Sequence, residues 1–270
     1  IYSAHTNLDN AQGGVNYKIA EKIGLKNLKV LEPKENSLIK LVTFVPNTKA
    51  DAVREALFAA GCGNIGNYDS CSYNLEGEGT FRAKEGTHPF CGAIGELHRE
   101  GEVRIETILP AFKKSAVVRA LLAVHPYEEP AFDIYPLQND WTQAGSGIIG
   151  ELDKSETELE FLKRIKKTFE VGCLRHNKLT GREIRKVALC GGAGAFLLPQ
   201  AIRSGADVFI TGEIKYHDYF GHEGEILMTE IGHYESEQYT KEIFYSIIRD
   251  LFPNFALQLS KINTNPIKYL

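Results

Sequence analysis

The sequence predicts an α/β protein in which a mostly parallel sheet flanked by helices is interrupted by an inserted α+β domain of ferredoxin-like order. Short apolar runs alternate with helical stretches in the last part of the chain, which is typical of a sheet covered on both faces. Between residues 38 and 138 the order changes to β-α-β-β-α-β, the split βαβ pattern. A length of 270 residues suits this two-part organisation.

The inserted domain is therefore expected over residues 38–138. Its first helix is expected to begin near Thr48, where a capping-box pattern stands, and to end at Gly61. Its second helix must end before Pro126. Strands are expected at residues 40–45, 68–75, 95–97, 103–109 and 131–137, with a polar turn at 99–101.

The surrounding α/β domain is expected to be discontinuous, over residues 1–37 and 139–270. A helix is expected after the capping pattern at residues 155–158, with one apolar stripe. A second helical run covers residues 196–203. Strands are expected at residues 1–4, 147–152, 171–174, 187–190, 208–211 and 226–229.

Composition excludes several classes of protein. The net charge of −4 and the lack of a basic block make nucleic acid an unsuitable principal partner. No apolar run is long enough to span a membrane, and no signal peptide opens the sequence. Five cysteines without a CxxC pair fit free thiols, so we expect a cytoplasmic protein. Because Ile1 lies within what reads as a strand, we expect a further N-terminal part in the natural protein.

Polar residues follow several of the predicted strands. In open α/β sheets, ligands bind beyond the carboxyl ends of the strands. His233 and Glu237 are four residues apart at the start of a predicted helix, so both side chains share one face and could bind a divalent cation. Spacing alone fits equally well a helix start with favourable acidic residues. His5 and Asp9 have the same separation across a turn, where coincidence competes with a shared role.

A glycine-rich turn and a basic segment are further candidates for the site. Gly191, Gly192 and Gly194 precede a helical run, where backbone amides could hold an anion. A tight turn with close helix packing explains them as well. Lys215 could meet a phosphate and His217 could transfer protons, or both could be a solvated helix start.

Taken together, these motifs resemble the Nif-three-like family, whose members carry the name type 2 homologue of GTP cyclohydrolase 1. The resemblance covers nearly the whole chain. The inserted domain resembles the PII/CutA-like domain of the longer bacterial members. The motifs are residues 5–9 (HTNLD), 191–194 (GGAG), 205–208 (GADV), 211–217 (TGEIKYH), 232–237 (GHYESE) and, in the inserted domain, 123–130 (AVHPYEEP).

The resemblance implies a dinuclear metal centre. Asp9 would bind the first ion, His233 the second, and Glu237 would bridge the two, with His5 close by. Zn, Mn and Fe are not distinguished. Family members also supply two adjacent histidines from an N-terminal segment, and this sequence has no such pair. The resemblance further implies a toroidal homohexamer with the metal sites facing an internal cavity.

Two functions follow as hypotheses. The first is a metal-dependent hydrolase of the GTP cyclohydrolase type acting on a nucleotide-like small molecule, with His5 or His217 moving protons. The second is a non-catalytic metal-binding or regulatory hexamer that acts through its PII-like domain. The coordination shell discriminates between them, because an open position with bound water supports catalysis.

Overall fold

The computed structural model describes residues 2–269 and divides the chain into two compact units. Unit 1 contains the residues up to Lys34 and those from Thr142 onward, and unit 2 contains Glu35–Trp141. Each junction lies three residues from the boundary expected from the sequence. Among the described residues, no helix combines the length and apolar character needed to cross a membrane.

Unit 1 is built on a six-stranded sheet of order β1-β6-β8-β9-β10-β7. The central strands β8, β9 and β10 are parallel, whereas the β1–β6, β6–β8 and β7–β10 pairs are antiparallel. The sheet is therefore mixed, and the prediction of a mostly parallel sheet is wrong. Apolar runs report burial on both faces, but they do not report strand direction. The strands are β1 (Lys26–Pro33), β6 (Gly145–Thr157), β7 (Arg175–His176), β8 (Glu183–Cys190), β9 (Val208–Thr211) and β10 (Leu227–Glu230).

Helices of unit 1 cover both faces of this sheet. Along β8, Val187 and Leu189 belong to one apolar cluster, while Ala188 and Cys190 belong to another. This alternation follows from the two-residue period of a strand. The first cluster includes side chains of α2, α5 and α8, and the second includes side chains of α6. The helices are α1 (Thr6–Asp9), α2 (Val15–Ile23), α5 (Glu158–Thr168), α6 (Leu198–Arg203), α7 (His233–Glu237) and α8 (Thr240–Leu251), with 3-10 turns η3 (Ala195–Leu197) and η4 (Tyr216–Tyr219).

Several expected elements of unit 1 differ from the structure. Residues 2–4 form no strand and lead directly into the short helix α1, and residue 1 lies outside the described residues. Residues 171–174 form a loop, and the strand β7 begins only at Arg175. The capping box of α5 is made by Thr157 and Glu160 rather than by the segment that begins at Ser155. The helical run at 196–203 divides into η3 and α6.

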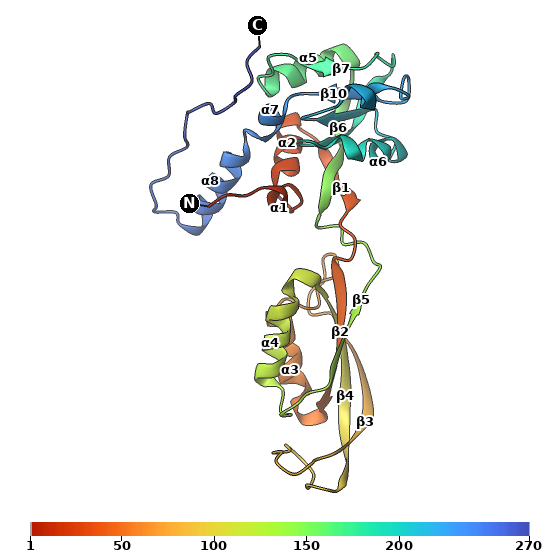
Figure 1. Ribbon diagram of the computed structural model, residues 1–270, viewed down its shortest axis with the longest axis vertical. Coiled ribbons are helices and arrows are strands. Elements are labelled where there is room, and N and C mark those ends of the chain that lie inside the picture. The colour runs from red at the N-terminus through yellow and green to blue at the C-terminus, as the bar shows by residue number, and fades with distance from the viewer. Residues whose placement is uncertain (1, 270) are drawn as a thin grey trace. The chain divides into compact units, whose positions relative to one another are not determined.

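Unit 2 has a four-stranded antiparallel sheet of order β3-β4-β2-β5. Both of its α-helices lie on one side of the sheet (Figure 1). Leu41 of β2 packs with Leu57 and Leu121, one from each helix, in an apolar cluster of its own. The elements are β2 (Leu38–Pro46), α3 (Ala50–Ala59), β3 (Tyr73–Arg82), β4 (Leu97–Pro110), α4 (Lys114–Val124) and β5 (Phe132–Pro136), with 3-10 turns η1 (Asn47–Lys49) and η2 (Ala111–Lys113).

The hairpin of unit 2 differs from the prediction. The polar residues 99–101 form no turn, because they lie inside β4, and the expected strands at 95–97 and 103–109 fall largely within this one strand. β4 pairs with β3 along 97–106 and with β2 along 102–110, so it is held by a neighbour along its whole length. The preceding strand also begins later than expected, at Tyr73.

Candidate metal centre

Asp9 ends the short helix α1 and is tied to the sheet by a buried asparagine. The Nδ2 of Asn16 donates to the backbone oxygen of Asp9 at 2.9 Å, and the amide of Gly191 donates to Oδ1 of Asn16 at 2.8 Å. Asn16 is only 2% exposed. These two hydrogen bonds join the start of the chain to the turn that follows β8, so sequence-distant segments meet at one edge of the sheet.

His233 and Glu237 are the first and last residues of α7, which follows β10. Their side chains share one face of the helix, with 3.6 Å between His233 Nε2 and Glu237 Oε1. The His233 side chain is 45% exposed and that of Glu237 is 33% exposed, so both are accessible from solvent. Gly232, at φ +95°, precedes the helix and lets the chain turn sharply out of the sheet.

Glu213 is a site residue that the sequence did not single out. It follows β9, and its Oε1 lies 2.6 Å from Nδ1 of His233. When Nδ1 carries the proton and donates it to Glu213, Nε2 keeps its lone pair on the side of Glu237. A carboxylate on the far nitrogen is the usual partner of a metal-binding histidine. The signals in the sequence were the position of Glu213 just after a buried strand and its place in the motif at residues 211–217.

Gly192 allows the turn after β8 to approach the site closely. A Cβ atom at this position would lie 2.5 Å from Oε1 of Glu237 and 3.4 Å from Nε2 of His233. Its φ of +62° also lies in the region that glycine favours. Any larger residue here would fill the space between the turn and the two polar side chains.

The amides of the glycine-rich turn are already used inside the protein, which corrects the expectation of an anion site at Gly191, Gly192 and Gly194. Gly191 donates to Asn16, as described above. Gly192 donates to Oγ of Ser236 at 2.9 Å, and Gly194 donates to Oγ1 of Thr211 at 2.9 Å. The turn therefore joins the loops of the site and offers none of these three donors to an anion.

The carboxylates of the site are electrostatically strained. Burial raises the pKa of Asp9, and the nearby charges of His5 and His233 oppose this shift. Burial also raises the pKa of Glu237, and the negative charge of Asp9 adds to the effect. Burial and these two carboxylates raise the pKa of the Cys190 thiol to about 12. A bound cation would relieve this excess of negative charge, so the donor set of Asp9, His233 and Glu237 fits a divalent metal.

The other predicted residues are placed differently. His5 is exposed, and its charge acts on both Asp9 and Glu237. Lys215 and His217 are also exposed, and the His217 ring lies edge-on to Tyr216. Within residues 2–269, neither Lys215 nor His217 has a hydrogen bond or ion pair with Asp9, His233 or Glu237. The structure brings His5 toward the candidate metal centre and does not join the other two to it.

A second group of possible metal ligands lies in unit 2. Among the residues that the structure describes, Cys91, His98 and Glu100 form the one group of three whose donor atoms all lie within 4.8 Å of one another. Asp9, His233 and Glu237 do not meet this spacing as a set. The unit 2 group could not be predicted from the sequence, because its members lie in an irregular loop and on alternate residues of a strand.

Comparison with known proteins assigns the chain to a family. A family model described as Duf34/NIF3 (NGG1p interacting factor 3) matches residues 1–266. The chain belongs to the Duf34/NIF3 family. Relatives named "GTP cyclohydrolase 1 type 2 homolog" are 43% identical in Halalkalibacterium halodurans and 37% identical in Bacillus subtilis. Each match covers 100% of this chain and 74% of the relative.

Solved structures agree with this family assignment. A Bacillus cereus protein related to NIF3 is 38% identical, with a TM-score of 0.82 over 100% of this chain and 73% of that one. A Staphylococcus aureus protein has a TM-score of 0.69 and 29% identity over 98% of this chain and 71% of its own. The mixed α/β fold is thus shared with other NIF3 proteins.

Proposed function

We propose that this NIF3 protein binds two divalent metal ions at the edge of unit 1, with Asp9 on one ion, His233 on the other and Glu237 between them. The observation that carries the proposal is that side chains from the chain's two ends lie near one another: the charge of Asp9 acts on Glu237, that of His233 acts on both carboxylates, and Glu237 and His233 lie beside Gly192. Asp9 and His233 would bind different ions, so they need not lie within the span of a single ion. Glu213 would hold the His233 ring in the orientation that leaves Nε2 free.

We further propose that the site hydrolyses a nucleotide-like small molecule. Paired divalent ions polarise a substrate oxygen and lower the pKa of bound water. His5 is the side chain placed to hold or move a proton beside Asp9 and Glu237, because its charge already acts on both. The name of the relatives, "GTP cyclohydrolase 1 type 2 homolog", makes GTP the first substrate to try.

Metal analysis combined with turnover tests this proposal. Purified protein should contain divalent metal, and the His233→Ala and Glu237→Ala variants should contain less of it than wild type. Turnover of GTP, followed by chromatography of the products, should stop on chelation and in Glu237→Ala. His217→Ala is the matched control and should keep both metal and turnover, since its exposed ring is not joined to the site. Unchanged rates in Glu237→Ala would refute the catalytic role.

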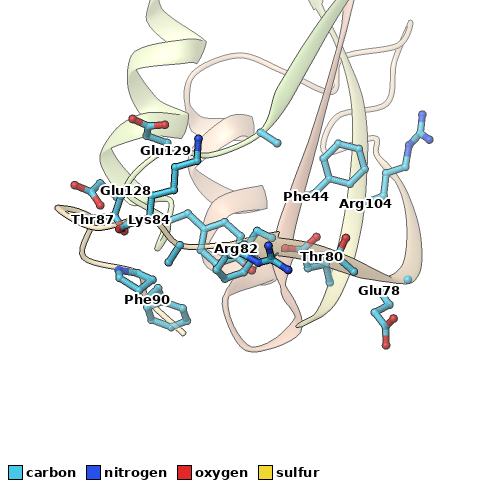
Figure 2. A pocket seen from close by; sticks show the side chains of 18 of the residues that line it. Phe44, Glu78, Thr80, Arg82, Lys84, Thr87, Phe90, Arg104, Glu128 and Glu129 are labelled. Atoms are coloured by element: carbon cyan, nitrogen blue, oxygen red, sulfur yellow. Dashed lines mark hydrogen bonds between the residues drawn. The ribbon is translucent and has the colours of Figure 1, made fainter. Parts of the chain in front are cut away.

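A second candidate function is favoured by a cavity in unit 2. We propose that unit 2, whose elements follow the order β-α-β-β-α-β, is a PII/CutA-like module, a kind of domain that binds ligands or partners. A cavity of about 780 Å³ lies against its sheet. Basic and acidic side chains, including Arg82, Lys84 and Glu128, surround it together with Phe44 and Phe90 (Figure 2). We propose, as the alternative, a regulatory metal-binding protein that senses a small ligand here.

The two functions make opposite predictions for chemistry and the same prediction for assembly. We propose a homohexamer in both cases, which light scattering coupled to size exclusion would measure. In the regulatory case, substitution of Arg82 and Phe90 by alanine abolishes ligand binding to unit 2, and no substrate turns over in the metal-loaded protein. In the hydrolase case, the same double variant keeps metal-dependent turnover.

A further inference from the structure

His98 and Glu100 lie two residues apart on β4, and their side chains therefore point to the same face of the strand. The Nε2 of His98 is 2.8 Å from Oε2 of Glu100. Cys91 comes from the loop between β3 and β4, and its sulfur lies within 4.8 Å of a carboxylate oxygen of Glu100. The sulfur, the imidazole nitrogen and a carboxylate oxygen thus meet within 4.8 Å.

The local backbone holds Cys91 against His98. Gly92, at φ +79°, follows the cysteine, and a Cβ added there would lie 2.8 Å from both Cβ and Cγ of His98. Only glycine permits this approach without a clash. On the neighbouring strand, Phe81 stands opposite His98 in register, with ring centroids 5.2 Å apart. The imidazole is therefore confined between the glycine turn and an aromatic ring.

The charge around the cluster is negative. Glu102 lies on the same face of β4, is only 8% exposed, and accepts a hydrogen bond from the Tyr127 hydroxyl at 2.7 Å. Burial, together with the hydrogen bond and charge of Glu100, raises the pKa of the Cys91 thiol. Hydrogen bonds from His98 and Cys91 lower the pKa of Glu100. A divalent cation bound here would neutralise more of this negative charge than the protons of His98 and Cys91 do.

We propose that Cys91, His98 and Glu100 bind one divalent ion of the zinc type, at a site separate from that of unit 1. Sulfur, imidazole nitrogen and carboxylate oxygen are all ordinary zinc ligands, at about 2.3 Å for sulfur and about 2.0–2.2 Å for the others. The three ligand atoms lie within 4.8 Å of one another, so a small movement of the Cys91 loop and of the Glu100 carboxylate would bring all three to these distances from one ion. On binding, the thiol S–H bond breaks and its proton goes to solvent. The proton between His98 Nε2 and Glu100 also leaves, to solvent or to Nδ1 of the ring, so that the sulfur, the nitrogen lone pair and the carboxylate can all bind the metal.

The three residues leave a coordination position open. Sites with three protein ligands hold water or an exogenous group at the fourth position, whereas closed structural sites use four protein ligands. The cluster also adjoins the cavity of unit 2, since Phe81, whose ring lies against that of His98, lines that cavity together with Phe90 and Tyr127. The ion could therefore bind a small ligand in the cavity as well as stabilise the β3–β4 hairpin.

Cobalt titration of the metal-free full-length chain tests the site. A thiolate bound to Co²⁺ gives a charge-transfer band in the near ultraviolet, whereas oxygen and nitrogen ligands do not. We expect this band at one equivalent, and we expect Zn²⁺ to remove it by displacement. His98→Gln and Glu100→Gln should weaken Co²⁺ affinity by at least about 10-fold. Cys91→Ser should abolish the band, and circular dichroism checks that each variant is folded.

Two controls separate this site from other thiols and from unit 1. Cys173 is an exposed free thiol, so Cys173→Ser should keep the band. The double variant His233→Ala with Glu237→Gln removes the proposed ligands of unit 1 and should also keep it. A wild-type protein without the band would overturn the proposal. A band that survives Cys91→Ser, or that disappears with the unit 1 ligands instead, would overturn it as well.

Discussion

At the scale of single residues, the candidate metal centre depends on side chains that each do a different task. Asp9, His233 and Glu237 are the proposed donors, while Asn16, Ser236 and Thr211 fix the loops through hydrogen bonds to the glycine turn. Gly192 keeps the space between them open. Substitution of the residues that fix the loops should therefore weaken metal binding, as substitution of the proposed ligands should.

Glu213 gives the sharpest test of this division. Glu213→Gln should lower the affinity of unit 1 for a divalent ion by about 10- to 100-fold, because the His233 ring loses the carboxylate that orients it. A competition titration with a chelating dye measures the affinity. The exposed Glu223→Gln is the matched control and should leave the affinity unchanged. Equal affinities in the two variants would show that the His233–Glu213 contact is incidental.

Glu237 should make the stability of the metal-free protein depend on pH. Its pKa in the fold is raised above its ordinary value of 4.5, chiefly by burial. Protonated Glu237 therefore favours the fold below the ordinary pKa, and this contribution is lost as pH rises through the raised pKa. Metal-free Glu237→Gln should have a higher melting temperature than wild type near pH 8 and no such advantage near pH 4.

The same comparison with metal present should give the opposite order of melting temperatures. Bound metal stabilises only a protein that retains its ligands, so wild type should then melt above Glu237→Gln. Differential scanning fluorimetry with and without chelator measures both conditions. The prediction would be contradicted if the difference in melting temperature between metal-free wild type and Glu237→Gln stayed the same from pH 4 to pH 8. Burial of the ionised carboxylate would then not destabilise the fold.

The sequence predicted the proposed ligands of unit 1 but not the residues that support them. Asp9, His233 and Glu237 could be named because they stand at the ends of apolar runs and in recognisable motifs. Glu213 and Asn16 could not, because their roles arise from the approach of β9, α7 and α2 in space. The role of Cys91 could not be predicted either. Its loop joins β3 to β4, and the pairing of these strands, which places Phe81 opposite His98, is known only from the structure.

At the scale of elements, helix α5 shows how a buried charge can be structural. Glu158, only 5% exposed, is the first residue of the helix. Its carboxylate accepts hydrogen bonds from the amide and hydroxyl of Thr180 and from the amide of Gly181, at 2.8–2.9 Å. These bonds fasten the loop before β8 to the start of α5.

Removal of this carboxylate should therefore be costly. Glu158→Ala should destabilise the protein by about 2–4 kcal/mol, because buried donors lose a charged acceptor. Chemical denaturation followed by far-ultraviolet circular dichroism measures the change. Asp153→Ala, at an exposed position of β6, should change stability by less than about 0.5 kcal/mol. A loss of under 1 kcal/mol in Glu158→Ala would mean that water replaces the carboxylate.

Local sequence patterns explain which elements could be predicted. The helices α3, α4 and α5 have clear apolar stripes, so their approximate positions followed from the sequence, although only α5 has a capping box and no side chain caps α3 or α4. The hairpin did not, because charged residues such as Arg99 and Glu100 suggested a turn. These residues lie on a strand whose outer half has partly exposed faces, and exposed strand positions accept charge without ending the strand.

At the scale of the whole molecule, the chain has separate apolar cores. The two clusters that cover the unit 1 sheet draw only on unit 1, and the cluster under the unit 2 sheet draws only on unit 2. The sequence predicted this division from the change in element order. It could not predict the antiparallel outer strands of unit 1, because strand direction depends on connections rather than on local pattern.

Separate cores predict separate responses to core mutations. Phe209 in unit 1 and Leu57 in unit 2 are both fully buried, and each alanine variant should lose about 2–5 kcal/mol in its own unit. Hydrogen exchange read by mass spectrometry should show faster exchange in β8–β10 for Phe209→Ala and in β2 and β4 for Leu57→Ala. Because no core residue is shared, the double variant should reproduce the sum of the two patterns. Faster exchange in both units after a single substitution would show instead that the chain unfolds as one cooperative body.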